Sequence, residues 1–428
     1  MKRPRIATIA VALLILAPFA LWAEGSQEEA EGPTSMNIII GEWAGDVLEP
    51  FFEEYGEENN VTVEYEAYPF RELFETIQIR QEANAEDIDA FFVDAPLVPS
   101  YAVRGYMKDI SDYFTPSVID ETWADGSGDA GYWDGRFYAP PLNNSTQVMY
   151  YNKDLLEEAG IDFPSEDPND RWTWDEVVEA ATAVNELGQG TWGFAFDQIN
   201  RYYQLQVLPE SLGGGSGVTD DGLEVDITNP EWITAHEWYG RLFNEWAISP
   251  KGASPAEVPE LFSAGNIGFF VGGLWNIPAF NEAGIDYAVA PHPYFEEGEP
   301  ATPTLSWHVG VWSHTRNEEA AVDFVKYLTM DPEIGQFWLE EHGQFPARKE
   351  VLSFIMEDDK YAEQPFIGYR IGRYEVLNSS ILRARTPAFL EFEELLSNAY
   401  EDIRNGADVE STLSGTEQQL SNMFERYQ

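Results

Sequence analysis

The 428-residue sequence contains no cysteine. A chain without thiols can form neither a disulfide framework nor a thiolate metal site. It also cannot carry a lipid on an N-terminal cysteine. If the chain is exported, we therefore expect it to diffuse freely in a periplasm or outside the cell.

Basic residues are scarce in this sequence. Lys and Arg number 24, of which seven are Lys, against 76 Asp and Glu, and the formal net charge is −52. Such a field repels nucleic acids and anionic membrane surfaces, so neither is an expected partner. The acidic residues are spread along the chain, which is typical of a surface kept soluble in a salty habitat.

Long apolar runs are absent except at the start of the chain. A basic beginning is followed by the uncharged stretch Ile6–Trp22. This order predicts a secretory signal peptide over residues 1–23 that is cleaved after Ala23, although Leu21 is larger than the residue usually preferred there. An uncleaved anchor is the alternative, but the stretch is close to the lower limit for a membrane span and Pro18 interrupts it.

The segment 36–110 alternates between strand and helix patterns. A chain of this length favours two domains of roughly 150 to 200 residues each. Strands are expected at 36–43, 61–68 and 87–94, and helices at 48–59, 71–84 and 100–110. The alternation indicates an α/β fold with a mostly parallel sheet and helices on both faces.

Ligands of such sheets bind outside the carboxyl ends of the strands. Glu42, Trp43 and Asp94 fall at those ends. Helix capping is the alternative role for both carboxylates, and core packing is the alternative for Trp43.

Local signals continue further along the chain. Asp134-Gly135 predicts a hairpin turn, and Gly160 is expected to end a helix that begins at Lys153. Thr173 and Glu176 have the spacing of a capping box at the start of the next helix.

An apolar run, "IGFFV" at 267–271, predicts a buried strand. We expect Gly272 and Gly273 to form a tight turn after it that brings Trp275 to the end of the strand. The indole then either fills the core or faces a flat ligand.

The order of several motifs resembles a known family. The motifs are "GRFYAPP", "YYNKDLLEEAGID", "TWDEVVEAA", "GFAFD", "APHPYFEEGEP", "NEEAAVDFVKYLTMDPE" and "HGQFPAR". Their order and spacing are similar to those of type 1 extracellular solute-binding proteins of bacterial sugar importers, to which maltose-binding protein is related. The resemblance covers nearly everything after an acidic linker at 24–35.

The resemblance implies a two-lobed periplasmic-binding-protein fold of type II, like that of maltose-binding protein, with a central ligand cleft. It places the first lobe at 36–142 plus 294–328 and the second at 146–287 plus 331–428. Hinge crossings are implied near 143–145, 288–293 and 328–332.

A sugar site combines aromatic faces with polar groups that are already oriented toward hydroxyls. Residues of these types lie at the predicted strand ends and loops: Glu42, Trp43, Asp94, Asn144, Asp197, Trp275, Trp307, His308, Gln344, Arg383 and Arg385. Trp275 occupies the position of the family's "G-x-W" tryptophan, which commonly stacks on ligand. For His308 we favour a structural role over ligand contact, and for at least one of the two arginines we favour ion pairing.

The resemblance implies capture without reaction, followed by delivery to the permease of an ABC transporter. We expect a monomer with no catalytic residue, no metal and no cofactor. The five histidines lack metal-binding spacing, and "LGGGSGV" lacks the lysine of a phosphate loop. A binding protein for a polyamine or peptide is the main alternative, and a secreted glycoside hydrolase is a remote one, because no local signature selects a carboxylate pair.

We expect the mature protein to begin near Glu24 and to lack a membrane anchor. Mass spectrometry of the protein released from the envelope of its native host measures this. Recovery in the membrane fraction with residues 1–23 retained would contradict the prediction.

Overall fold

A computed structural model describes residues 35–188 and 190–427. The predicted signal peptide and most of the linker lie outside these residues, so their processing stays a prediction. Within the described part of the chain, no helix has both the length and the apolar character needed to cross a membrane.

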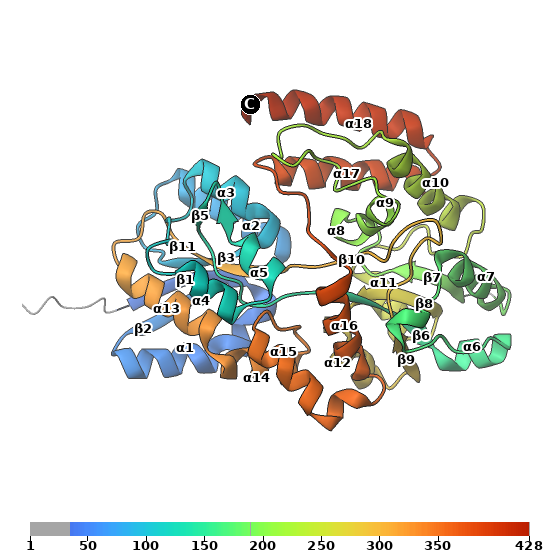
Figure 1. Cartoon of the computed structure of the whole chain (residues 1–428), viewed down its shortest axis with the longest axis horizontal. Coiled ribbons are helices and arrows are strands. Elements are labelled where there is room, and N and C mark those ends of the chain that lie inside the picture. The colour runs from blue at the N-terminus through green and yellow to red at the C-terminus, as the bar shows by residue number, and fades with distance from the viewer. Residues whose placement is uncertain (1–34, 189, 428) are drawn as a thin grey trace, which may run out of the picture.

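The first sheet has the strand order β11-β3-β1-β2. Its strands are β1 (Ser35–Gly41), β2 (Thr62–Tyr68), β3 (Ala90–Asp94) and β11 (Trp307–Val311). The first three are parallel, and β11 returns antiparallel to β3. Helices α1 (Gly45–Asn59), α2 (Phe70–Glu82), α3 (Val98–Arg104) and α13 (Glu318–Met330) belong to this body, which we call the first lobe; it lies on the left in Figure 1.

The second sheet has the order β7-β8-β6-β9. Its strands are β6 (Gln147–Asn152), β7 (Trp192–Phe196), β8 (Ile267–Gly273) and β9 (Tyr287–Ala290). β6 runs antiparallel to both of its neighbours, β8 and β9, and β7 pairs parallel with β8, so β7, β8 and β9 share one direction and the sheet is mixed through β6. It packs against α6 (Lys153–Ala159), α7 (Trp174–Asn185), α11 (Glu257–Ser263) and other helices, and forms the second lobe on the right in Figure 1.

Three long helices form a layer above the second lobe (Figure 1). They are α10 (Pro230–Asn244), α17 (Phe389–Arg404) and α18 (Val409–Phe424), and they pack on one another. The short helices α8 (Tyr202–Leu205) and α9 (Val207–Ser211) lie beneath them.

The helices that follow α13 lie along the boundary between the lobes. They are α14 (Pro332–His342), α15 (Lys349–Glu357) and α16 (Ile367–Asn378). The first packs on α1 and α13, and the second on α4 (Pro116–Thr122) of the first lobe. The third packs on β6 and β9, so the chain has reached the second lobe by α16.

Several local predictions are confirmed. Thr173 and Glu176 form both bonds of a capping box at the start of α7. Gly160 ends α6 in the left-handed conformation, and Asp134 and Gly135 both have positive φ in the turn between β4 (Tyr132–Trp133) and β5 (Arg136–Phe137). The helix expected over 100–110 ends earlier, at Arg104, because Gly105 adopts a left-handed conformation.

The expected turn at Gly272 and Gly273 is wrong. Both glycines lie inside β8, opposite Val148 and Gln147, and Gly273 has an extended backbone. The reversal is made by the 3-10 helix η4 (Leu274–Asn276). A Cβ on Gly273 would collide with the ring of Trp275, so close approach of the indole, not chain reversal, requires glycine here.

We expect Gly273→Ala to lower the free energy of unfolding by about 1–3 kcal/mol, because the added methyl must displace the Trp275 ring. Urea unfolding followed by circular dichroism measures the change. Gly252→Ala is the matched control, since a Cβ there meets nothing within 4 Å. Equal stabilities for the two variants would contradict the close contact.

Candidate ligand-binding site

The segments that connect the lobes are held together by two adjacent asparagines. Asn143 donates from Nδ2 to Gln344 Oε1 (3.0 Å) and accepts the Trp307 N–H at Oδ1 (3.0 Å). Asn144 Oδ1 accepts from Thr304 Oγ1 and the Leu305 N–H, both at 2.9 Å. Both side chains are buried, so their amides serve to join chain segments from three parts of the sequence.

An aromatic cluster forms the first lobe's side of the boundary. Trp43, in the 3-10 helix η1 (Glu42–Ala44) after β1, lies 4.7 Å from Trp307 and 6.2 Å from Phe70, measured between ring centroids. Phe74 stacks on the far side of Trp307. Trp307 is 8% exposed while Trp43 and Phe70 are only partly buried, so Trp43 and Phe70 are the members that reach solvent.

The second lobe repeats this arrangement. Trp275, in η4 after β8, is partly buried and lies 6.3 Å from the ring of Tyr203. A Cβ on Gly41 would collide with Trp43 just as one on Gly273 would collide with Trp275. Each lobe therefore ends a sheet strand with Gly-x-Trp and folds the indole over its own glycine.

Asp197, at the end of β7, is 4% exposed. Its carboxylate accepts from Asn276 Nδ2 (3.0 Å) and from the side chain of Trp275. Burial raises the pKa of Asp197 to about 6, against the lowering effect of these hydrogen bonds. In this geometry the group orients the indole of Trp275.

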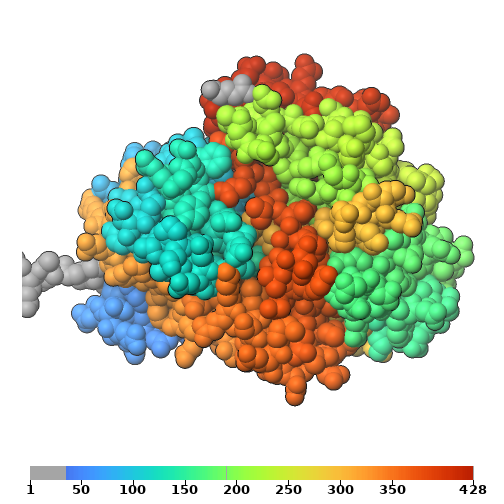
Figure 2. Space-filling view, in the orientation of Figure 1, coloured from blue at the N-terminus to red at the C-terminus, as the bar shows by residue number. Residues whose placement is uncertain are grey.

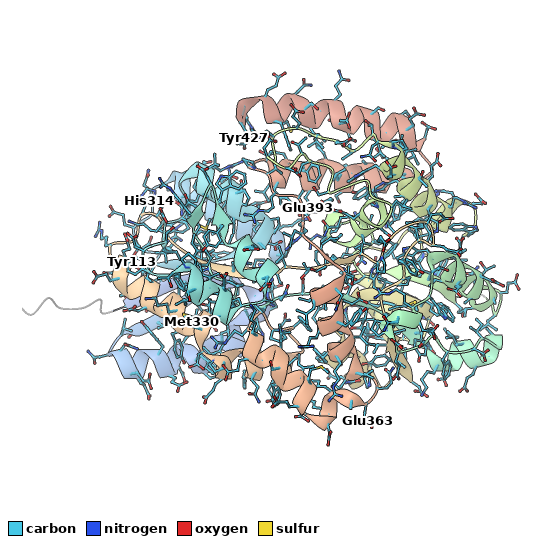
Figure 3. All side chains as sticks on the ribbon, viewed as in Figure 1. Tyr113, His314, Met330, Glu363, Glu393 and Tyr427 are labelled. Carbon is cyan, nitrogen blue, oxygen red and sulfur yellow. The ribbon has the colours of Figure 1, made fainter. Side chains whose placement is uncertain are left out.

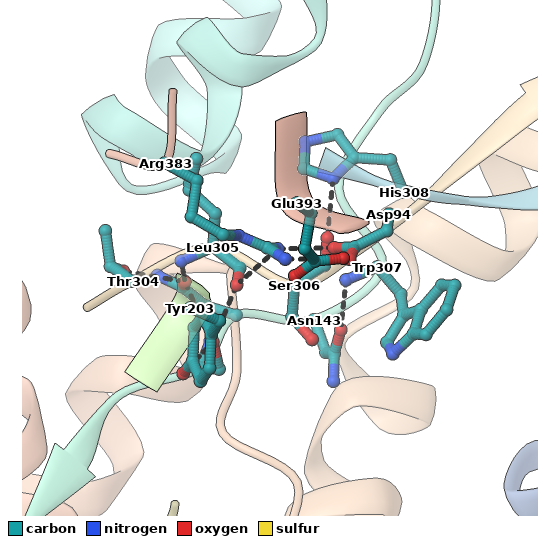
Figure 4. A network of polar contacts seen from close by, with 12 residues as sticks. Asp94, Asn143, Tyr203, Thr304, Leu305, Ser306, Trp307, His308, Arg383 and Glu393 are labelled. Carbon is teal, nitrogen blue, oxygen red and sulfur yellow. Dashed lines mark hydrogen bonds and ion pairs between the residues drawn. The ribbon is translucent and has the colours of Figure 1, made fainter. Parts of the chain in front are cut away.

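A buried ion pair crosses between the lobes (Figure 4). Arg383 donates to both carboxylate oxygens of Asp94, from Nη1 at 2.7 Å, and to the Leu305 carbonyl at 3.2 Å. Its guanidinium lies 5.1 Å from the ring centroid of Tyr203 in the second lobe. The side chains of Arg383 and Asp94 are 3% and 6% exposed, so this ion pair is shielded from water.

Arg201 is a second bridge that the sequence analysis missed. Its guanidinium lies 4.5 Å from the ring centroid of Phe70 in the first lobe. Its Nη2 donates to Glu393 Oε1 at 2.9 Å, and Nη1 donates to Gln198. Glu393, labelled in Figure 3, lies on α17 near the lobe boundary. The only available signal was the "RYY" tripeptide after β7, which no motif selects.

The remaining predicted residues lie in different environments from one another. Glu42 is exposed beside Trp43. Gln344 is partly buried and bonded to Asn143. Arg385 donates to the backbone carbonyls of Asp129 and Tyr132.

His308 is fully buried, 3.1 Å from the Ser127 carbonyl at Nε2 and 3.3 Å from the Ser306 carbonyl at Nδ1. Burial lowers its pKa to about 4, so the ring is neutral near pH 7 and donates from one nitrogen only. The described residues contain no cluster of three or more His, Asp or Glu side chains that could hold a metal ion.

The molecule has two sheet-based lobes that are joined by several connections and face one another with aromatic and polar side chains. This arrangement defines a two-lobed ligand-binding protein. The family model described as bacterial extracellular solute-binding protein matches residues 43–332. The chain belongs to this family and is a binding protein, not an enzyme.

Curated relatives and solved structures agree with this assignment. The maltotriose-binding protein of Pyrococcus abyssi is 26% identical over 78% of this chain and 70% of its own length. The maltodextrin-binding protein of Bacillus subtilis is 25% identical over 80% of each chain. The ABC substrate-binding protein Lmo0181 of Listeria monocytogenes, solved with cycloalternan, superposes with a TM-score of 0.79 over 92% of this chain and 100% of that one, at 22% identity.

The raised pKa of Asp197 predicts a pH-dependent contribution to stability. The folded state holds this proton more tightly than the unfolded chain, so the contribution is complete below about pH 4 and is lost as pH rises through about 6. Relative to Asp197→Asn, we expect the native protein to lose on the order of 3 kcal/mol of unfolding free energy across this window.

Urea titrations at several pH values measure the difference between the two proteins. The exposed Asp162→Asn variant corrects for removing one negative charge. A pH-independent difference between native protein and Asp197→Asn would contradict the raised pKa.

Proposed function

We propose that this protein captures a sugar or oligosaccharide between its two lobes and delivers it to an ABC permease. The observation that carries the proposal is the pair of partly exposed indoles, Trp43 and Trp275, one in each lobe and each after a sheet strand. Flat aromatic faces on both sides of a boundary suit a ligand with patches of C–H on both faces. The names of the relatives, which bind maltotriose and maltodextrin, support the same class.

Charge at the lobe boundary argues against a polyamine. A cationic ligand needs carboxylates that are free to pair with it. Asp94 is already bonded to Arg383, and Glu393 to Arg201. With these two carboxylates neutralised by arginines, Glu42 is the exposed carboxylate left beside Trp43, and one free carboxylate suits a hydroxyl-rich ligand better than a polycation.

Arg201 and Arg383 also supply contacts that stabilise a closed arrangement of the two lobes. Both extend contacts across the boundary: Arg201 to Phe70, and Arg383 to Asp94. A ligand that touches both indoles would add contacts available only when the lobes are close together, and so shift the population toward the closed form.

As a proposal, the lobes are those of the sequence analysis, 36–142 plus 294–328 against 146–287 plus 331–428, with the second and third crossings shifted as follows. The bonds of Asn143 and Asn144 to Thr304, Leu305 and Gln344 support crossings near 143–145 and before β11. The packing of α14 and α15 on the first lobe favours a third crossing later than 328–332, before α16.

We propose the ligand contacts as Trp43 and Trp275 with Glu42, Tyr203 and Arg201 around them. The exported protein acts as a monomer, outside the cytoplasmic membrane, and carries no lipid anchor. The family's transport role supports delivery to a permease on a separate chain.

A panel of ligands tests the proposal on the mature protein. Thermal unfolding with maltotriose, maltodextrins and arabino-oligosaccharides should raise the melting temperature in proportion to the logarithm of ligand excess over Kd. Putrescine and short peptides are the competing arms. Stabilisation by an amine alone, or release of shortened sugar products at enzymatic rates, would overturn the proposal.

We expect Trp275→Ala to weaken the affinity for the stabilising sugar about ten- to a hundred-fold, because stacking on a flat ligand contributes roughly 1–3 kcal/mol. Calorimetric titration measures the affinity, and urea unfolding measures stability. Trp246→Ala is the matched control, since Trp246 is also partly buried but packs on Trp238 and Arg241. Unchanged affinity beside a large loss of stability would assign Trp275 to the core.

A further inference from the structure

A cavity of about 530 Å³ opens beside the connecting segments, lined by α5 (Asp125–Ala130), α15 and α16. Its lining includes Ser127, Lys349 and Arg373, with Asn144 and Thr304 behind them. None of the aromatic residues of the candidate ligand site lines it. In Figure 2 the teal segment that holds α5 meets the orange-red segment that holds α16 near the middle of the visible face.

Arg373 is the unusual residue of this cavity. Of the described basic residues, Arg71 and Arg373 alone have no hydrogen bond, ion pair or ring contact within the part of the chain that the structure describes. Arg71 is exposed, whereas Arg373 is partly buried and its Nε is shielded from solvent without a partner. In a chain of net charge −52, an arginine left without a carboxylate is conspicuous.

A second donor beside the same cavity lacks a partner. Ser127 is 1% exposed, and its Oγ is buried without a hydrogen bond. The Oγ atom is not exposed to the cavity space, so Ser127 belongs to the wall and an occupant of the cavity does not contact this hydroxyl. The backbone carbonyl of Ser127 is already in contact with His308 Nε2, so Ser127 is fixed in place.

The charge of the lining is positive. Lys349 donates to Asp125 Oδ1 (2.8 Å) and to the Asp120 carbonyl (2.7 Å), which neutralises the one carboxylate of the lining. Arg373 then remains as uncompensated charge. The volume lies within the range of small-molecule sites, about 300–1,000 Å³.

We propose that this cavity is a second binding site, for a small oxyanion such as phosphate, sulfate or a carboxylate. Arg373 supplies a guanidinium whose donors are all free, and a charge-assisted hydrogen bond to an oxyanion is stronger than one between neutral groups. The occupant would contact α5 of the first lobe and α16, which packs on the second sheet. The proposal does not depend on the identity of the ligand captured between the lobes.

The test uses inorganic phosphate, sulfate, acetate and citrate on the mature protein without sugar. Ionic strength is held constant with sodium chloride, because screening alone stabilises a strongly acidic chain. Calorimetric titration and thermal unfolding should show saturable binding of at least one of these anions, and the arm that binds identifies the class of oxyanion.

Arg373→Gln should weaken that binding about ten-fold or more, as expected for the loss of a charged hydrogen-bond donor. Arg71→Gln is the matched control, since it removes the same charge from an exposed residue. Arg373→Gln breaks no hydrogen bond or ion pair of the described structure, so its unfolding curve should match that of the native protein.

Absence of saturable anion binding in the native protein would overturn the proposal. Equal binding by native protein and Arg373→Gln would also overturn it, by placing the anion elsewhere on the surface.

Discussion

Two buried amides determine how the halves of this protein are joined. Asn143 and Asn144 are consecutive, so the main chain fixes their side chains relative to one another. Through them the first crossing is bonded to Leu305, Trp307 and Gln344, which come from two later parts of the chain. An amide offers both donors and an acceptor in one plane, which a carboxylate cannot do. The relative placement of the aromatic walls therefore depends on polar bonds shielded from water, where each is expensive to lose.

The scarcity of basic residues makes their placement informative. With 24 cations against 76 anions, most carboxylates must remain in solvent. Arg201 and Arg383 are nevertheless both committed to the lobe boundary, where each pairs with a carboxylate and lies over an aromatic ring. Guanidinium groups suit this position because they are planar, weakly hydrated and able to stack. Two carboxylates of the boundary, Asp94 and Glu393, are thus each offset by a cation in a strongly acidic molecule.

Short-range signals in the sequence predicted local structure well. Thr173 and Gly160 act within a few residues of themselves, so their roles follow from spacing alone. Trp43 and Trp275 were found because each follows an apolar strand. Gly273 was misjudged because glycine serves turns and close contacts equally well, and only the folded position of the indole distinguishes them. The role of Arg201 depends on Phe70, 131 positions away, and no local pattern contains that pairing.

The Gly-x-Trp units also limit how ligand preference can change in this lineage of proteins. Each indole rests on the backbone of its own strand, where any side chain at Gly41 or Gly273 would displace it. The position of each indole therefore depends on the absence of a side chain at Gly41 or Gly273. Glu42 is exposed and has no such constraint, whereas Arg201 is held by Glu393 and Phe70. The preference for a ligand can then change through exposed polar side chains near the indoles, while the indoles keep their positions.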